Sequence, residues 1–253
     1  LFAQDNLINA LANNQGKDVQ KYYQIKPVLA LDATDVKNQG WSGTCWSYAG
    51  SSFLESEALK KKKKPVDLAE IYTARKIYLD KAINYVRMQG ALNWGDGGEP
   101  HDVINSYRRY GVLPQSAYTG LINGATYNNF DEMQKDLKPY LEELVKMKKL
   151  PDNWKEVFEK KMDAYLGEVP KTFMYNGKIY DAHSFAKEYV GLEDEKYIEM
   201  ISVEDKPKYH NTLMAVPDNW SYDYAFNVNM EDLIRTIDYA LKKGYTVGWE
   251  ADV

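Results

Sequence analysis

The chain has 253 residues, of which 44% are hydrophobic and 27% are charged, a composition typical of a globular protein with one large or two smaller cores. Its formal net charge of −5 argues against a general nucleic-acid binder, which would be basic. No apolar run approaches the roughly 20 residues of a membrane span, so we expect neither nucleic acid nor a membrane as a partner.

The sequence begins without methionine, with the residues LFAQD at positions 1–5. A short apolar stretch that ends in a small residue is typical of the remnant of a secretory signal peptide, and an arbitrary chain boundary explains it equally well. A secreted or periplasmic location is slightly favoured, with a cytoplasmic location as the alternative. Residues 1–35 are predicted to be an N-terminal segment that crosses the surface before the first domain.

Residues 36–49, VKNQGWSGTCWSYA, contain the only cysteine of the protein, Cys45. A glycine-rich loop precedes it, and helical spacing begins directly after it. The apolar stripe of that helix is formed by Trp46, Ala49, Gly50, Phe53 and Leu54. The pattern predicts a thiol in the first turn of a buried helix, where unpaired N–H groups and the helix dipole favour the nucleophilic thiolate.

Gln39 precedes Cys45 by six residues and offers a side-chain N–H donor at the mouth of the same loop. A donor in that position is suited to a developing oxyanion. An isolated cysteine is more often a small buried hydrophobic residue. The context Gln-Gly-x-x-Gly-x-Cys-Trp favours the nucleophile instead.

This segment resembles the active-site segment of papain-like cysteine peptidases, whose pattern is Gln-Gly-x-Cys-Gly-Ser-Cys-Trp. The resemblance implies that Cys45 is the nucleophile, Gln39 the oxyanion-hole glutamine, and Trp46 a substrate-binding residue beside the nucleophile. Ser42 stands where secreted members carry the first cysteine of a disulfide. Loss of that cysteine is typical of the bleomycin hydrolase (aminopeptidase C) branch.

The helix that Cys45 begins is expected to continue into the lysines at positions 60–64 and to stop at Pro65. These lysines suit a solvated helix C-terminus, where cations offset the dipole. Residues 67–70, DLAE, have the pattern of a capping box and predict a second helix that runs to about Met88 and ends at Gly90.

Residues 93–100, NWGDGGEP, place three glycines within four positions, which makes a tight turn or lets the backbone of a ligand approach closely. Papain-like enzymes pair an Asn-Gly-Gly at the matching distance with the substrate backbone. Asp96, Gly97 and Gly98 resemble it, so the resemblance implies that they bind substrate. Gly95 replaces a second disulfide cysteine of the secreted branch, in agreement with Ser42.

Residues 36–120 are therefore expected to form the papain-like helical half that carries the nucleophile. Residues 121–225 depart from the compact papain pattern and resemble the inserted, mostly helical subdomain of bleomycin hydrolases. Within it, residues 173–180 are predicted to form a hairpin with Asn176-Gly177 as a type I′ turn. Further helices are predicted over residues 103–110, 130–148 and 153–165.

The last predicted elements are a helix capped by Asn229 and ended by Gly244, and a strand over residues 245–253. Residues 226–253 are expected to begin the papain-like β half, whose C-terminal part is missing from this chain.

A cysteine nucleophile of this kind needs an imidazole base, and the chain offers three histidines. His101 follows the glycine turn and is expected at the surface near the substrate-binding wall, His183 opens an amphipathic segment, and His210 lies in a polar loop. We assign none of them as the base. Aligned by order with the family, the catalytic histidine and its orienting asparagine are expected beyond Val253, in the same or a separate chain.

The expected fold is α+β and papain-like, and the expected reaction is amide hydrolysis through a thioester on Cys45, with Gln39 stabilising the oxyanion. Three scattered histidines and no paired-cysteine spacing predict no metal and no cofactor. The resemblance implies a peptide substrate trimmed from its N-terminus, with exo- or endopeptidase action left open, and homo-oligomers, such as the hexamer of family relatives. The alternatives are a non-catalytic peptide-binding or interaction protein on the same scaffold, and a helical structural protein without a cleft at Gly97 and Gly98.

Overall fold

The computed structural model describes residues 26–62, 64–193 and 196–251. The backbone divides into two units after Ala30, and Leu31–Val253 forms one compact unit that carries every element described below. The predicted signal remnant at residues 1–5 lies outside the described residues, as does most of the predicted N-terminal segment.

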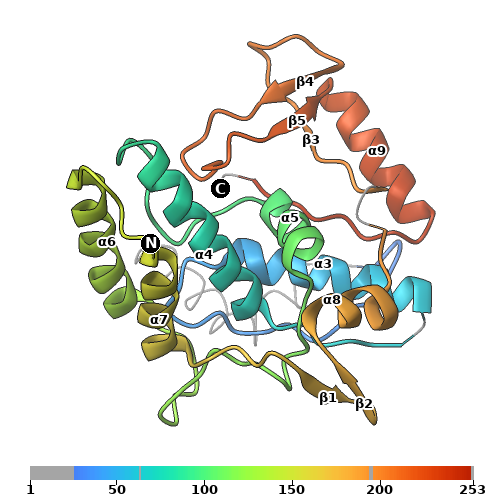
Figure 1. Cartoon of the computed structure of the whole chain (residues 1–253). Coiled ribbons are helices and arrows are strands. Elements are labelled where there is room, and N and C mark those ends of the chain that lie inside the picture. The colour runs from blue at the N-terminus through green and yellow to red at the C-terminus, as the bar shows by residue number, and fades with distance from the viewer. Residues whose placement is uncertain (1–25, 63, 194–195, 252–253) are drawn as a thin grey trace, which may run out of the picture. The chain divides into compact units, whose positions relative to one another are not determined.

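Helices account for most of the regular structure in the described part of the chain (Figure 1). In chain order the helices are α3 (Cys45–Lys62), α4 (Glu70–Arg87), α5 (Pro100–Tyr110), α6 (Asp131–Lys146), α7 (Trp154–Leu166), α8 (Ala182–Ser184), the π-helix η1 (Phe185–Val190) and α9 (Met230–Lys242). The strands are β1 (Phe173–Tyr175), β2 (Lys178–Tyr180), β3 (Met200–Ile201), β4 (His210–Leu213) and β5 (Tyr224–Asn227). The fold is therefore a mixed α+β fold. None of the described helices is both long and apolar enough to cross a membrane.

The strands form two small sheets. β1 and β2 pair antiparallel, with Phe173 opposite Tyr180. Their turn residues Asn176 and Gly177 have φ values of 49° and 78°, which confirms the type I′ turn. In the second sheet β5 is central, with β3 parallel on one side and β4 antiparallel on the other.

α3 packs against both α4 and α5. Trp46 and Leu54 of its apolar stripe are buried, whereas Ala49 is exposed. At Gly50 the crossing with α5 is so close that an added Cβ would lie 2.9 Å from Val103 Cβ. The small residue thus sets how near the helix of the cysteine comes to the helix that follows the glycine loop.

α6 and α7 pack against each other and against α4. The rings of Tyr78 on α4 and Phe158 on α7 both meet the indole of Trp94 edge-on, at centroid distances of 5.9 and 6.0 Å. An aromatic core therefore joins the residues just before the glycine loop to the helices of the 121–225 region.

Two expectations about helix starts are wrong in detail. α4 begins at Glu70 with Ala69 as N-cap and no side-chain cap, because the carboxylate of Asp67 pairs with Lys37 at 2.5 Å instead. α9 does have Asn229 at its N-cap position, but that side chain donates to Tyr209 Oη at 2.9 Å. A charged or phenolic partner from elsewhere in the chain competes with a local N–H for the same side chain.

The strand expected over residues 245–253 is not formed in its described part, 245–251. After α9 the N–H of Tyr245 bonds to Ala240 O at 2.9 Å, which completes the end of the helix. A strand needs a ladder partner, and within the described residues β3, β4 and β5 pair only with one another.

Candidate active site

Cys45 is the first residue of α3, and its side chain is exposed. The carbonyl of Thr44 accepts from the N–H groups of Ser47 and Tyr48 at 2.9 and 3.1 Å, which starts the helix directly beneath the thiol. The prediction of a thiol at a helix N-terminus is confirmed.

The loop before Cys45 is held by its own polar groups. Gln39 Nε2 donates to Ser42 O at 2.6 Å, and Ser42 Oγ donates back to Gln39 O at 2.9 Å. Ser42 Oγ also lies 2.6 Å from Thr44 Oγ1 in a buried contact. Ser42 therefore connects both ends of this loop by hydrogen bonds. Because a primary amide has two N–H groups, Gln39 keeps one donor for an oxyanion, and that role stays a prediction.

The surroundings of Cys45 oppose ionisation of its thiol. Partial desolvation raises the pKa of Cys45 above its ordinary value, and the carboxylates of Glu250 and Asp218 raise it further. The backbone N–H groups of Trp46 and of Cys45 itself lower the pKa, as expected of a helix N-terminus. The helix end therefore favours the thiolate, as the sequence predicts, but desolvation and the two acidic residues outweigh it, so the net shift of the pKa is upward.

The glycine loop lies against the loop of the nucleophile. Asp96 Oδ2 accepts from Gly43 N at 2.9 Å, and Asp96 O accepts from Trp46 Nε1 at 2.8 Å. Trp46 and Gly98 are both buried, and Gly97 is half-buried. The structure thus brings Cys45, Trp46, Asp96 and the two glycines together in one region, as the motifs predict. Contact of these residues with a peptide stays a prediction.

Lys81 supports the glycine loop from α4 and was not identified from the sequence. Its Nζ donates to the carbonyls of Gly95, at 2.7 Å, and of Gly97, and the residue is 3% exposed. Burial lowers the pKa of Lys81, although Asp102, Asp218 and Asp96 oppose this. Its place in the sequence among the apolar positions of α4 was the available signal, because a lysine there must find polar partners inside.

Gly98 and Gly95 provide a matched pair of substitutions in this loop. A Cβ at Gly98 would lie 2.8 Å from Trp46 Cε2 and 2.9 Å from Asp102 Oδ2, whereas one at Gly95 would meet no atom within 4 Å. We expect Gly98→Ala to destabilise the fold by about 1–3 kcal/mol through overpacking, and Gly95→Ala to change stability by less than about 0.5 kcal/mol. Thermal unfolding of both variants checks this, and equal midpoints would contradict it.

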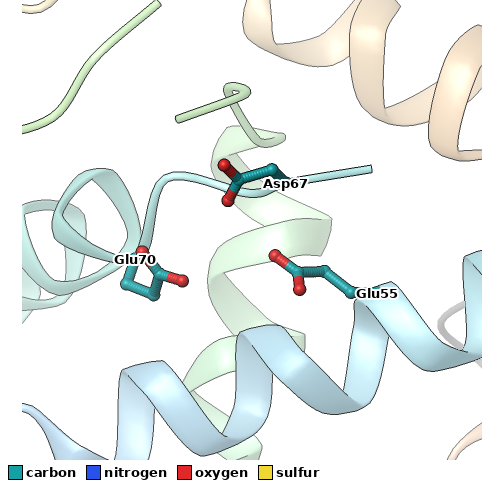
Figure 2. Close-up of side chains that lie close together, drawn as sticks. All are labelled: Glu55, Asp67 and Glu70. Atoms are coloured by element: carbon teal, nitrogen blue, oxygen red, sulfur yellow. The ribbon is translucent and has the colours of Figure 1, made fainter. Parts of the chain in front are cut away.

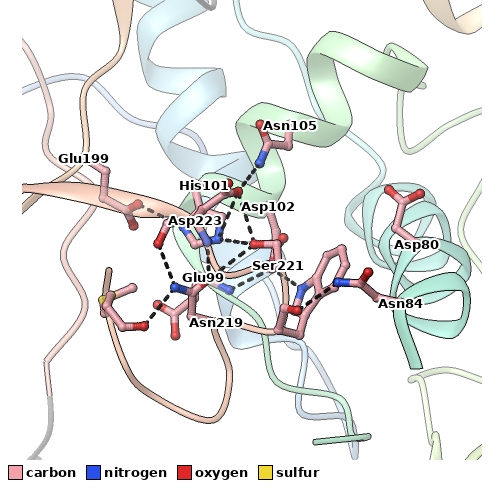
Figure 3. Close-up of polar contacts among 12 residues, drawn as sticks. Asp80, Asn84, Glu99, His101, Asp102, Asn105, Glu199, Asn219, Ser221 and Asp223 are labelled. Atoms are coloured by element: carbon pink, nitrogen blue, oxygen red, sulfur yellow. Dashed lines mark hydrogen bonds and ion pairs between the residues drawn. The ribbon is translucent and has the colours of Figure 1, made fainter. Parts of the chain in front are cut away.

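His101 is the only histidine held in the interior. Its Nδ1 lies 2.9 Å from Glu199 Oε2, and its Nε2 lies 3.1 Å from Ser221 Oγ and 3.7 Å from Asp223 Oδ2 (Figure 3). Burial lowers the pKa of His101, but the hydrogen bond with Glu199 and the charges of Asp102, Glu199 and Asp223 raise it to about 9. The expectation of a surface histidine is wrong: the side chain is 10% exposed and both ring nitrogens have partners.

The other two histidines are exposed. His210 Nδ1 lies 2.8 Å from Lys208 O. Within the part of the chain that the structure describes, no hydrogen bond joins Cys45 to His101, His183 or His210. The geometry therefore gives Cys45 no base among these three residues.

Three carboxylates, those of Glu55, Asp67 and Glu70, converge between α3 and the start of α4 (Figure 2). Their oxygen atoms lie within 4.8 Å of one another, as metal ligands would. The ammonium of Lys37 sits among them, 3.0 Å from Glu55 Oε1, 2.5 Å from Asp67 Oδ1 and bonded to Glu70. Burial lowers the pKa of Lys37, but these three partners raise it well above its usual range. The charged ammonium of Lys37 therefore occupies the space between the carboxylates of Glu55, Asp67 and Glu70, which we call the cage.

The sequence and the fold of this chain are similar to those of known proteins. None of the protein-family models compared with the sequence matches it. The cysteine proteinase 1, mitochondrial, of Saccharomyces cerevisiae is 24% identical over 245 residues, which cover 87% of this chain and 47% of the relative. The crystal structure of PepW from Lactobacillus rhamnosis HN001, a selenomethionine derivative, matches with a TM-score of 0.71 and 20% identity over 96% of this chain and 66% of that one.

The resemblance to the bleomycin hydrolase group of cysteine peptidases is confirmed. The mixed α+β fold is that of PepW. The chain spans about half the length of the curated relative that it matches.

Proposed function

We propose that the chain carries the nucleophile part of a papain-like cysteine peptidase, in which Cys45 attacks a peptide carbonyl and forms a thioester acyl-enzyme. The observation that carries the proposal is the exposed thiol of Cys45 on the first residue of α3, behind a loop that presents Gln39. The similarity to the yeast cysteine proteinase 1 supports the same class of reaction.

The chemical roles follow from the geometry. The N–H groups at the start of α3 and the amide of Gln39 would stabilise the oxyanion that forms when sulfur adds to the carbonyl carbon. Collapse of that intermediate expels an amine, which must receive a proton, and water then hydrolyses the thioester. We infer that the proton donor is a histidine beyond Val253, because His101 is held by Glu199 and Ser221.

Covalent labelling by the peptidyl epoxide E-64 tests the proposal. The 253-residue chain should take up one equivalent, and Cys45→Ser should take up none, because Cys45 is the one cysteine among these residues. A peptide that binds at the site should protect Cys45 from the label. Failure of the epoxide to label Cys45, together with tight binding of the same peptide, would favour a non-catalytic peptide-binding protein.

The labelling experiment also addresses the site of cleavage. If the protein trims peptides from the amino terminus, a peptide with a free α-amine should protect Cys45 better than its N-acetylated form. Equal protection would favour an endopeptidase.

A further inference from the structure

Asp96 receives hydrogen bonds from four separate parts of the fold. Its Oδ2 accepts from Gly43 N at 2.9 Å, in the loop before α3, and its backbone carbonyl accepts from Trp46 Nε1 at 2.8 Å, on α3. Its Oδ1 accepts from Tyr78 Oη on α4 and from Gln134 Nε2 on α6. The carboxylate is therefore occupied by donors of the chain itself.

The donors around Asp96 are in turn constrained. Tyr78 is 1% exposed, and burial together with Asp96 raises its pKa well above the usual range, so the phenol keeps its proton and donates it. Gln134 Nε2 also lies 2.5 Å from Tyr78 Oη, while Gln134 Oε1 accepts from Trp94 Nε1 at 2.7 Å. Because every neighbour of the carboxylate is a donor, this position requires a side chain that only accepts.

The contact with the loop of the nucleophile is also close in space. A Cβ added at Gly43 would lie 2.6 Å from Asp96 Cβ, so the side chain of Asp96 packs directly against the backbone of Gly43. Gly43 is two residues before Cys45, and Trp46 directly follows Cys45. Two hydrogen bonds to Asp96 thus fix the chain on both sides of the nucleophile, at Gly43 and at Trp46.

We propose that Asp96 is a positioning residue, which holds residues 43–46 so that the thiol and the N–H groups at the start of α3 face the reacting carbonyl. This inference rests on the proposed function and replaces the expectation that Asp96 binds substrate. A displacement of about 1 Å at a reacting group can cost on the order of 100-fold in rate, so the orientation of this turn matters more than its stability.

The two oxygens of Asp96 allow the role to be tested by paired variants. Asp96→Asn keeps the shape, but its single oxygen cannot serve Gly43 N–H and the donors of Tyr78 and Gln134 together. Tyr78→Phe removes one donor from Oδ1 and leaves the bond to Gly43 intact. The first variant disturbs the nucleophile loop, and the second disturbs only the interior side of the carboxylate.

The measurement is the rate of alkylation of Cys45 by iodoacetamide between pH 6 and 10, with thermal unfolding in parallel. Iodoacetamide is small and uncharged, so it reports on the thiol and not on substrate contacts. We expect Asp96→Asn to slow alkylation at pH 7 about tenfold and to move the midpoint upward, because Cys45 loses the fixed N–H groups that lower its pKa while Glu250 and Asp218 remain. Tyr78→Phe should lower the unfolding midpoint yet leave the alkylation rate within twofold of the parent.

Two outcomes would overturn the inference. If Asp96→Asn is alkylated like the parent but a peptide no longer protects Cys45 from it, Asp96 contacts substrate. If both variants slow alkylation equally and in step with their loss of stability, Asp96 has only a structural role. Failure of E-64 to label the parent protein would instead count against the proposed function and would leave the comparison of the two variants intact.

Discussion

The 253-residue chain assayed alone with aminoacyl-coumarin substrates is expected to release product at the background rate. The thiol of Cys45 has a raised pKa, and His101, whose side chain is 10% exposed, is bound to Glu199 and Ser221. Without an imidazole the tetrahedral intermediate has no acid for its leaving amine, and general acid–base catalysis is worth roughly 10²–10⁴-fold. Supplying a histidine-bearing segment that continues past Val253, covalently or as a separate chain, should restore turnover by about that factor.

The pH dependence of alkylation gives a second measure of the same prediction. In the chain alone the midpoint should lie above the value of about 8.5 of an ordinary thiol, because desolvation, Glu250 and Asp218 disfavour the thiolate. An added imidazolium should lower the midpoint by favouring the thiolate. Cys45→Ser is the control for both assays. Turnover by the isolated chain that His183→Ala abolishes would show that the base had been misplaced.

Local chemistry made much of the helical part predictable. The spacing of apolar residues after Cys45 and the breaker Pro65 predict α3 nearly to the residue. Both signals, the helical period of the apolar residues and the proline that ends the helix, lie in or next to the segment itself. Asn176 and Gly177 predict their hairpin for the same reason, since a two-residue type I′ turn needs both residues at positive φ. The position of Cys45 in the site follows from that helix.

Long-range polar pairing was not predictable from the sequence. Asp67 looks like a helix cap in its own segment, and only the fold brings Lys37 to it. His101 looks like a surface residue until Glu199, 98 residues later, is placed beside it. The role of Asp96 depends on Gln134, which approaches only after α6 has packed on α4. Such pairs carry no periodic signal, so the supports of the site appear only with the tertiary structure.

Replacing Lys37 by Met is expected to cost about 3 kcal/mol of stability, because it leaves two buried carboxylates without their cation. The side chains of Glu55 and Glu70 are 0% and 2% exposed, and both pair with Lys37 Nζ. Glu55 Oε1 keeps its bond from Leu68 N at 2.7 Å, and Asp67 can turn to solvent, so the loss belongs at the lower end of the range for a broken buried pair. For a chain of this size, the midpoint of thermal unfolding should then be lower by about 6–12 °C.

Lys135→Met is the matched control, since Lys135 pairs with Glu132 at 2.7 Å while both side chains are at least 70% exposed. That change should cost less than about 1 kcal/mol. The loss in Lys37→Met should shrink as the pH falls toward 5: burial already raises the pKa of Glu70, and without Lys37 the folded state takes up protons there that the unfolded state does not. Equal unfolding midpoints for the two variants would show that the cage contributes no net stability.

The cage also predicts a rescue that a simple loss of packing does not. In Lys37→Ala the oxygens of Glu55, Asp67 and Glu70 lie within 4.8 Å of one another around the space left by the ammonium. Oxygen ligands in that arrangement suit Ca²⁺, and an ion that binds only the folded state raises its stability. Millimolar Ca²⁺ should therefore raise the unfolding midpoint of Lys37→Ala by several degrees, and that of the parent, whose cage holds Lys37, by less than about one degree. An equal response of the two proteins to Ca²⁺ would show that the ion acts elsewhere and that Lys37 does not fill a cation site.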